Sequence, residues 1–207
     1  MKNIRLVTVD IVGTVLRFSR PPVAQYRDVA ASQGLELELD QLSESFRHQW
    51  SEMNQTFPHF GSTTPGLSST RWWHQLVKQT FRDVLTDQCE DSKLSLMASE
   101  LYSYYHSPKP YVLVPEAVDT LAELRSRKIC VGAISNFDNR LHDILPSLGL
   151  AQYLQFIVTS EDAKASKPDS QIFDLASRRS LLAELKPEEI LHLGNVMNLT
   201  RLESSEG

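Results

Sequence analysis

The sequence between Ile4 and Val15 reads Ile4-Arg5-Leu6-Val7-Thr8-Val9-Asp10-Ile11-Val12-Gly13-Thr14-Val15, an apolar, β-branched run interrupted by one aspartate. Residues 4–9 predict a buried strand, because valine, isoleucine and threonine favour strands. Asp10 then stands at the carboxyl end of that strand, where open α/β sheets bind their ligands. Its position favours a nucleophile, and the alternative is an aspartate with a purely structural role.

The composition excludes several classes of protein. The 207 residues are 41% hydrophobic and 23% charged, which suffices for one core with an inserted subdomain. The net charge of −5 provides no basic excess for nucleic-acid phosphates, so no nucleic-acid partner is expected. No signal peptide and no run of membrane-spanning length is seen, which predicts an intracellular protein of the cytoplasm and/or nucleus with no membrane partner. Cys89 and Cys130 lack metal-ligand spacing and fit a reducing compartment.

Two kinds of periodicity divide the chain. Apolar residues recur at helical spacing through the first half, which predicts a bundle with the stripes Val23, Tyr26 and Val29; Leu42, Phe46, Trp50 and Met53; Trp73, Leu76, Val77, Thr80 and Val84; and Leu94, Met97, Leu101 and Tyr105. From Tyr111 onward, predicted strands at 129–135, 156–159 and 190–194 alternate with helices. Such alternation predicts a parallel sheet. The bundle is then predicted to be an insertion into the α/β part of the chain. Residues 1–18 and 111–207 would form an α/β core, and residues 19–110 would form a helical cap.

Four short motifs then carry a family resemblance. They resemble, in order and in placement at strand ends, the four motifs of the haloacid dehalogenase superfamily: Asp10 with Gly13-Thr14, Ser135-Asn136, Lys167-Pro168-Asp169, and Gly194-Asn195. The resemblance implies a Rossmannoid parallel sheet with an inserted α-helical cap. The stretches 57–61, 66–73 and 135–141 further resemble the type 3 branch of the haloacid dehalogenase-like hydrolase domain-containing proteins.

The resemblance implies a role for five residues. Asp10 would attack the substrate and form a covalent aspartyl intermediate. Ser135 would hydrogen-bond the transferred group, and Lys167 would balance negative charge, as fixed donors and cations do in such sites. Thr14 and Asn136 would help to bind a small-molecule substrate at the cleft between cap and core. Two of these residues also have structural alternatives, described next.

Ser135 and Lys167 admit plainer interpretations. Ser135 could cap the helix that follows it, with Asp138 favourably placed in the first turn. Lys167 could be a solvated loop lysine before a helix that a proline begins. The pair Glu161-Asp162 could likewise be a solvated helix start or could orient Lys167.

The sequence departs from the family pattern at the positions that serve acid–base chemistry and metal binding. Phosphatase members carry a second carboxylate where this chain has Val12, and losing such a proton donor costs about 10²–10⁴-fold in rate. The family binds Mg²⁺, but here the candidate ligands are Asp10, the Val12 backbone carbonyl and Asn195, followed by Thr200. Because Mg²⁺ prefers charged oxygen ligands, we expect its site to be weak or absent.

These departures leave three hypotheses for function. The first is a phosphatase-type hydrolase with an aspartyl nucleophile, whose activity is weak or lost. The second is a non-catalytic binding or regulatory module, a pseudoenzyme that keeps the scaffold. The third is a metal-independent 2-haloacid dehalogenase. Its leaving group is a halide, which needs no proton, and Arg17 or Arg20 would bind the carboxylate of its substrate.

Some features carry weaker expectations. Superfamily members normally continue past the fourth motif with a helix and a strand, so a splice variant or truncated gene model, with an exposed sheet edge prone to self-association, is one interpretation. Trp72 and Trp73 are expected in the core of the cap. His59 could face the cleft or the surface, and His192 is expected to be packed within the last strand.

Overall fold

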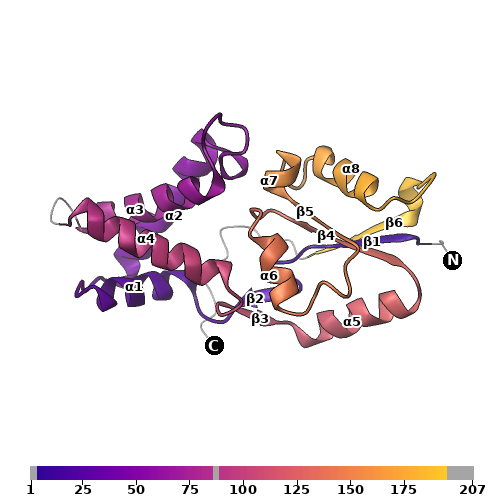
Figure 1. The fold of residues 1–207 in the computed structure, drawn as a ribbon, viewed down its shortest axis with the longest axis horizontal. Helices are drawn as coiled ribbons and strands as arrows, with labels where there is room; N and C mark the ends of the chain where they lie inside the picture. Colours follow the sequence, from indigo (N-terminus) through magenta and orange to yellow (C-terminus); the bar gives the residue numbers. More distant parts are fainter. Residues whose placement is uncertain (1–3, 86–88, 195–207) are drawn as a thin grey trace.

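A parallel sheet forms the centre of the molecule (Figure 1). The computed structural model describes residues 4–85 and 89–194. Strand order in the sheet is β5-β4-β1-β6, and every neighbouring pair is parallel. Its strands are β1 (Leu6–Val9), β4 (Cys130–Ser135), β5 (Phe156–Thr159) and β6 (Ile190–Leu193). The predicted α/β class with a parallel sheet is therefore confirmed, although three strands start or end one or two residues inside the predicted limits.

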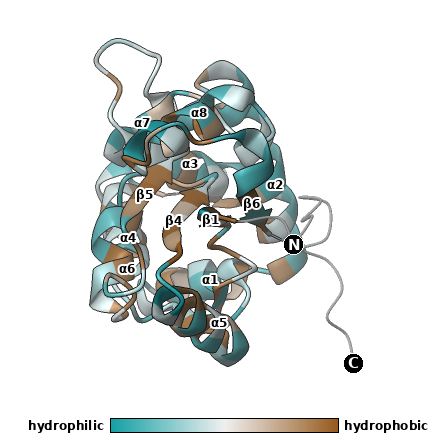
Figure 2. Cartoon of the chain, turned by 90° about the vertical axis from the view of Figure 1, so that its right-hand side faces the viewer, coloured by the Kyte–Doolittle hydropathy of each residue, from teal (hydrophilic) through white to brown (hydrophobic). Residues whose placement is uncertain are grey.

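Helices cover both faces of this sheet. Figure 2 shows α5 (Pro115–Ser126) on one side and α8 (Ser170–Arg179) on the other. The shorter helix α6 (Leu141–Ser147) follows β4, and the single turn α7 (Ser160–Ala163) follows β5. A 3₁₀ turn at Pro187–Glu189 leads into β6. Each parallel pair is thus joined through a helix, as parallel strands require.

The core has two layers because alternate strand residues face opposite sides of the sheet. Val7 and Val9 pack toward α5 and α6, whereas Leu6 packs toward α8. All four residues of β1 are buried, as expected for the central strand between two partners. Gly132 in β4 is required by packing, since a Cβ there would lie 2.0 Å from Cζ of Phe156.

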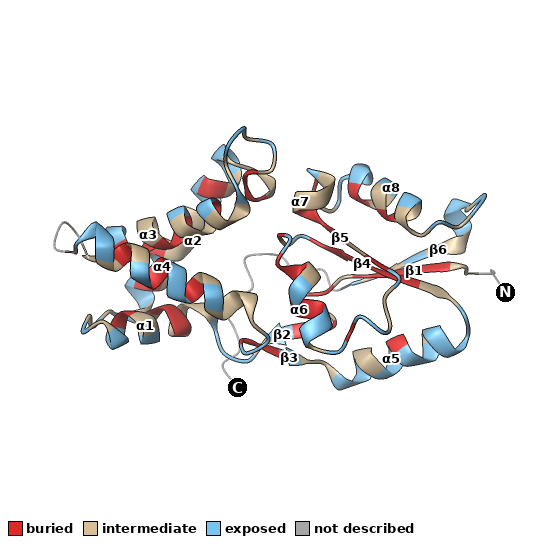
Figure 3. Ribbon diagram, viewed as in Figure 1, coloured by how far each residue is buried: buried red, intermediate tan, exposed pale blue. Residues whose placement is uncertain are grey.

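Four helices between the first two strands and the third form a bundle, which we call the cap. They are α1 (Pro22–Ser32), α2 (Leu39–Thr56), α3 (Ser69–Leu85) and α4 (Asp91–His106), with a 3₁₀ turn, η1 (His59–Gly61), after α2. The predicted stripes supply part of its buried residues, such as Leu42, Leu76 and Met97, whereas Phe81 and Ala98 are fully buried outside them. Figure 3 shows buried residues along all four cap helices. Trp72 is fully buried there, as expected.

A small antiparallel pair joins cap and sheet and was not predicted. Strand β2 (Leu16–Phe18) pairs with β3 (Tyr111–Leu113), so the chain leaves for the cap and returns from it side by side. The rings of Phe18 and Tyr111 pack with centroids 5.5 Å apart. Three residues are too few to show a period of two in the sequence, so only the pairing across the insertion defines these strands.

Candidate active site

Asp10 and Lys167 meet at the carboxyl ends of β1 and β4. The Asp10 backbone N–H donates to the Leu193 carbonyl at 2.8 Å, which extends the pairing of β1 with β6 by one residue. Lys167 Nζ lies 2.5 Å from Asp10 Oδ1 and donates to the Ile134 carbonyl at 3.0 Å. The Lys167 and Asp10 side chains are only 16% and 14% exposed. The structure therefore brings this predicted pair together as an ion pair and does not leave Lys167 as a solvated loop lysine.

Asn136 holds the backbone of Lys167. Its Oδ1 accepts from the Lys167 N–H at 2.7 Å, and its Nδ2 donates to the Lys167 carbonyl at 3.1 Å. One side-chain amide thus satisfies both backbone polar groups of the lysine, which fixes the point from which the long side chain reaches Asp10. The structure gives Asn136 this positioning contact, and its predicted contact with substrate stays a prediction.

Ser135 is the last residue of β4 and is 2% exposed. The alternative that it caps the next helix is wrong, because α6 begins at Leu141 after Arg140, which makes no side-chain cap bond. The expectation that a proline begins the helix after Lys167 is also wrong. That helix starts at Ser170, where Asp169 is the N-cap and accepts from the Gln171 N–H at 2.9 Å.

Thr14 lies in a tight turn directly after Asp10. The Gly13 backbone has φ of 92°, a left-handed conformation that glycine adopts without strain, and the Thr14 N–H donates to the Ile11 carbonyl at 3.2 Å. Val12 is partly buried and packs against the core cluster between the sheet and α5. The position that carries a proton donor in phosphatase members is therefore apolar in its surroundings as well as in its identity.

The described residues around Asp10 do not fit a magnesium site well. Within 4–85 and 89–194, no group of three or more His, Cys, Asp or Glu side chains is placed to hold a metal ion. One oxygen of Asp10 is already engaged by a lysine ammonium. Asn195 and Thr200 lie outside the described residues. A single paired carboxylate is a poor donor set for a hard cation that prefers several oxygen ligands.

His192 packs beside the pair, as expected. Its Nδ1 lies 2.9 Å from Thr8 Oγ1, and the Phe173 ring meets it edge-on at 5.3 Å. Burial lowers the pKa of His192, and the Lys167 charge lowers it further, although Asp10 and the Thr8 contact oppose them. A side chain at Gly194 would come within 3.1 Å of Asp10 Cβ and 3.4 Å of His192 Nε2.

A buried ion pair near the site is not evident from the sequence. The alternative in which Ser135 caps a helix puts Asp138 in the first turn of that helix, but Asp138 is fully buried and binds Arg140 through Nε at 2.8 Å and Nη2 at 2.7 Å. Trp73 of the cap donates its indole N–H to Asp138 at 2.6 Å, so it does more than fill the cap core. The Arg140 guanidinium lies 4.6 Å from the Trp73 ring centre and 4.7 Å from that of Tyr102. These aromatic residues tie the cap to the loop after Ser135.

Two acidic residues proposed to orient Lys167 have other partners. Glu161 accepts from the Asn139 N–H at 2.8 Å. Asp162 binds His142 and Arg179, each at 2.9 Å. The interpretation that the Glu161-Asp162 pair orients Lys167 is wrong, because the capping box of α7 turns Asp162 toward the start of its own helix.

The two arginines suggested for a substrate carboxylate lie on the surface. Arg20 pairs with Asp28 at 2.7 Å, and about half of each side chain is exposed. Arg17 is exposed on β2. Within the described residues, neither contacts Asp10 or Lys167.

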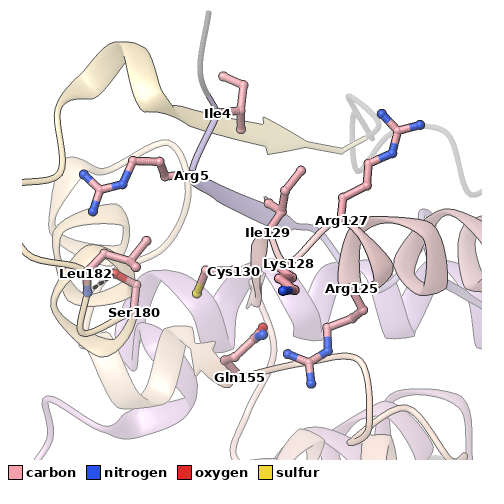
Figure 4. Close-up of a pocket in the computed structure, with 10 residues that line it drawn as sticks. All are labelled: Ile4, Arg5, Arg125, Arg127, Lys128, Ile129, Cys130, Gln155, Ser180 and Leu182. Carbon is pink, nitrogen blue, oxygen red and sulfur yellow. Dashed lines mark hydrogen bonds between the residues drawn. The ribbon is translucent and has the colours of Figure 1, made fainter.

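A hollow of about 790 Å³ lies at the other end of the sheet (Figure 4). It is lined by the amino ends of β1 and β4 and by the last turn of α5, with the cations Arg5, Arg125, Arg127 and Lys128 around it. Cations at a helix C-terminus complement the helix dipole, which accounts for those of α5. We therefore assign the candidate active site to the carboxyl ends of the strands and not to this hollow.

Comparison with known proteins identifies the family. A family model described as haloacid dehalogenase-like hydrolase matches residues 4–198. The chain belongs to this family of hydrolases. Haloacid dehalogenase-like hydrolase domain-containing protein 3 of Homo sapiens is 37% identical over 193 residues, 93% of this chain and 74% of that protein. The rhythmically expressed gene 2 protein of Drosophila melanogaster is 34% identical, over 94% of this chain and 76% of that protein. The branch predicted from the motifs is thereby confirmed.

Solved structures support the fold. The putative HAD-hydrolase YfnB from Bacillus subtilis, which was solved bound to magnesium, superposes with a TM-score of 0.66 at 18% identity, covering 94% of this chain and 81% of that one. The 2-haloacid dehalogenase from Pseudomonas syringae gives 0.62 at 22% identity, with 91% and 76% covered. These identities establish shared architecture only. No helix among the described residues combines the length and hydrophobicity needed to span a membrane.

Proposed function

We propose that this chain carries a phosphatase-type hydrolase site with an aspartyl nucleophile, in which the acid–base step is impaired and turnover is weak or lost. The observation that carries the proposal is the Asp10–Lys167 pair at the strand ends, with Val12 packed against the core beside it. The nucleophile and its cation are kept, whereas the usual proton donor is replaced by an apolar side chain. A small molecule bound between cap and core is the proposed substrate.

The two oxygens of Asp10 have different surroundings. Oδ1 is engaged by Lys167, and Oδ2 accepts no hydrogen bond from the residues that the structure describes. Oδ2 is therefore the proposed attacking atom: an Oδ2–P bond forms while the bond from phosphorus to the leaving oxygen breaks. Lys167 balances the charge that gathers on the phosphoryl oxygens. Water then attacks the acyl phosphate, which regenerates the carboxylate and releases phosphate.

The missing proton donor should matter most for poor leaving groups. An alkoxide must be protonated as it departs, whereas p-nitrophenolate leaves readily as an anion. We expect hydrolysis of p-nitrophenyl phosphate to be slow but measurable and hydrolysis of a simple alkyl phosphate to be undetectable. Phosphate release with and without added Mg²⁺ measures both, and Asp10→Asn is the control that must abolish the signal. Equal rates for the two esters would contradict the proposed defect.

The binding module is the second candidate, favoured by the same pairing, because Lys167 already neutralises Asp10 and no second carboxylate joins them in the described part of the chain. Saturable binding of inorganic phosphate without turnover of either ester would favour it. The dehalogenase hypothesis has weaker support, since Arg17 and Arg20 do not approach the pair. Halide release from 2-chloropropionate would favour it nonetheless.

A further inference from the structure

A chain of hydrogen bonds links the cap to Lys167. It starts at His59 in η1, where Nδ1 lies 2.9 Å from Ser166 Oγ. Ser166 Oγ donates to Ser160 Oγ at 3.0 Å, and Ser160 Oγ donates to Asn136 Oδ1 at 3.4 Å. Asn136 is the residue that holds the Lys167 backbone. One cap side chain is thus connected, through the neighbours of the lysine, to the candidate nucleophile.

The direction of these hydrogen bonds determines whether Nδ1 of His59 carries a proton. A hydroxyl has one proton, and Ser166 gives its proton to Ser160. Ser166 must therefore accept from His59, so Nδ1 carries a proton. Burial lowers the pKa of His59, and the Asp169 charge opposes this effect. At neutral pH the imidazole is mainly neutral, with Nδ1–H pointed at Ser166.

The backbone conformation of η1 determines where the His59 side chain lies. His59 and Phe60 have φ of 53° and 58°, a left-handed conformation that costs free energy for residues other than glycine. Phe60 is 4% exposed and packs its ring 5.2 Å from that of Trp72, which anchors the turn in the cap. The strained turn places His59 against the segment after β5, and Figure 1 shows this end of the cap next to α7.

We infer that His59 is a positioning residue, through which the cap orders the segment 160–167 and so holds Lys167 against Asp10. The inference deepens the proposed function and rests on it for the catalytic consequence. Without the His59 contact, Ser166 has no donor from the cap and the hydrogen bonds to Asn136 lose their outer support. Lys167 is then free to sample positions in which it does not face Asp10.

Hydrogen exchange of the full chain tests the ordering directly. The Lys167 amide is protected by Asn136 Oδ1, and peptides covering 160–169 report on it. Loss of one hydrogen bond in His59→Ala should speed exchange in this segment by about two- to tenfold. His59→Asn, whose side-chain amide can donate in place of Nδ1–H, should restore protection. The matched control is His48→Ala, since His48 is an exposed histidine on α2 of the same cap and should leave exchange unchanged.

Ser166→Ala gives an independent approach to the same contact. It should speed exchange in the segment as His59→Ala does, and the double variant should add little, because both changes break one chain of bonds. This comparison also serves if His59→Ala folds poorly. Exchange in both single variants equal to that in His48→Ala would overturn the inference, as would failure of His59→Asn to restore protection.

Kinetics separate this inference from the proposed function. If the wild type hydrolyses p-nitrophenyl phosphate, His59→Ala should lower kcat with little change in KM, and His59→Asn should recover part of it. A kcat equal to that of His48→Ala would overturn the positioning role. If the wild type has no turnover, the slow hydrolysis expected under the proposed function fails, and the exchange experiment alone decides whether His59 orders the segment.

Discussion

At the scale of single residues, the candidate site pairs Asp10 with Lys167 and has an apolar residue at position 12. Asp10 and Lys167 form their ion pair at low exposure, so the nucleophile is held in place. Val12 removes the proton donor, and its partly buried, apolar surroundings would oppose a charged replacement. Under the proposed function, the chemistry would be limited by the atoms next to Asp10 and not by the placement of Asp10 itself.

A double substitution tests whether these atoms are the cause. Val12→Asp combined with Asn195→Asp should create Mg²⁺-dependent hydrolysis of a simple alkyl phosphate where the parent shows none, because the two carboxylates supply acid–base help and metal ligation to one transition state. Each single change should have little effect. Thr200 still lacks a carboxylate, so the gain should fall short of a full phosphatase.

A soluble double variant with no gain would show that the motif residues are not the main defect. The thermal unfolding midpoint should be measured alongside the rate, because Val12→Asp places a carboxylate against an apolar cluster.

At the scale of elements, the cap is fixed to the sheet by few but specific contacts. Trp73 of α3 donates to the buried Asp138, and the rings of Trp73 and Tyr102 enclose Arg140. His106 of α4 binds Asp143 of α6 at 2.8 Å on the exposed side. Since surface pairs contribute little, the buried Trp73 contact carries most of the polar coupling.

Trp73→Phe should reveal this coupling. The ring remains to stack on Arg140, but the buried Asp138 loses one donor, so we expect about 1–3 kcal/mol less stability. Chemical unfolding of the full chain measures the change. Trp50→Phe is the matched control, because no hydrogen bond of its indole N–H is seen with described residues while its ring packs in the same aromatic cluster. Equal losses in both variants would assign the effect to packing alone.

At the scale of the whole molecule, histidines link stability to pH. Burial lowers the pKa of His59, His74 and His192 below their ordinary value of 6.5. The folded state therefore binds protons less readily than the unfolded chain. Stability contributed by the neutral rings is present above about pH 6.5 and is lost as pH falls through their lowered pKa values.

We expect the free energy of unfolding to decrease as pH falls below 6.5 and expect His192→Gln to reduce that decrease. Urea unfolding at several pH values measures it, with His48→Gln as the exposed comparison. A variant whose stability depends on pH as steeply as the wild type would exclude His192 as a contributor.

Magnesium provides a second test on the whole molecule. Because one paired carboxylate is a poor ligand set, millimolar Mg²⁺ should leave the unfolding midpoint unchanged relative to a chelator. A rise in the midpoint that disappears in Asp10→Asn would show a functional metal site. The self-association expected at the sheet edge stays a prediction, which sedimentation at increasing concentration would test.

Much of the fold follows from local sequence patterns. Residues 6–9 and 156–159 are rich in β-branched residues, and both strands were predicted within two residues. Apolar residues at helical spacing also predicted the cap helices, without their bounds. The short strands β2 and β3 were not, because they are defined only by pairing with each other across the insertion. The position of the motifs at strand ends predicted that Asp10, Ser135 and Lys167 lie at one end of the sheet.

The sequence by itself determined the class of fold and the family and predicted Asp10 as nucleophile with Lys167 as its cation, because these depend on periodicity and on residues next to one another in the chain. Tertiary structure decided the contacts: Lys167 reaches Asp10 across 157 positions, and His59 reaches Ser166 across 107. It also buried Asp138 with Arg140, where the sequence favoured a helix start. Such contacts depend on how helices pack on a sheet, and local preference carries no information about that packing.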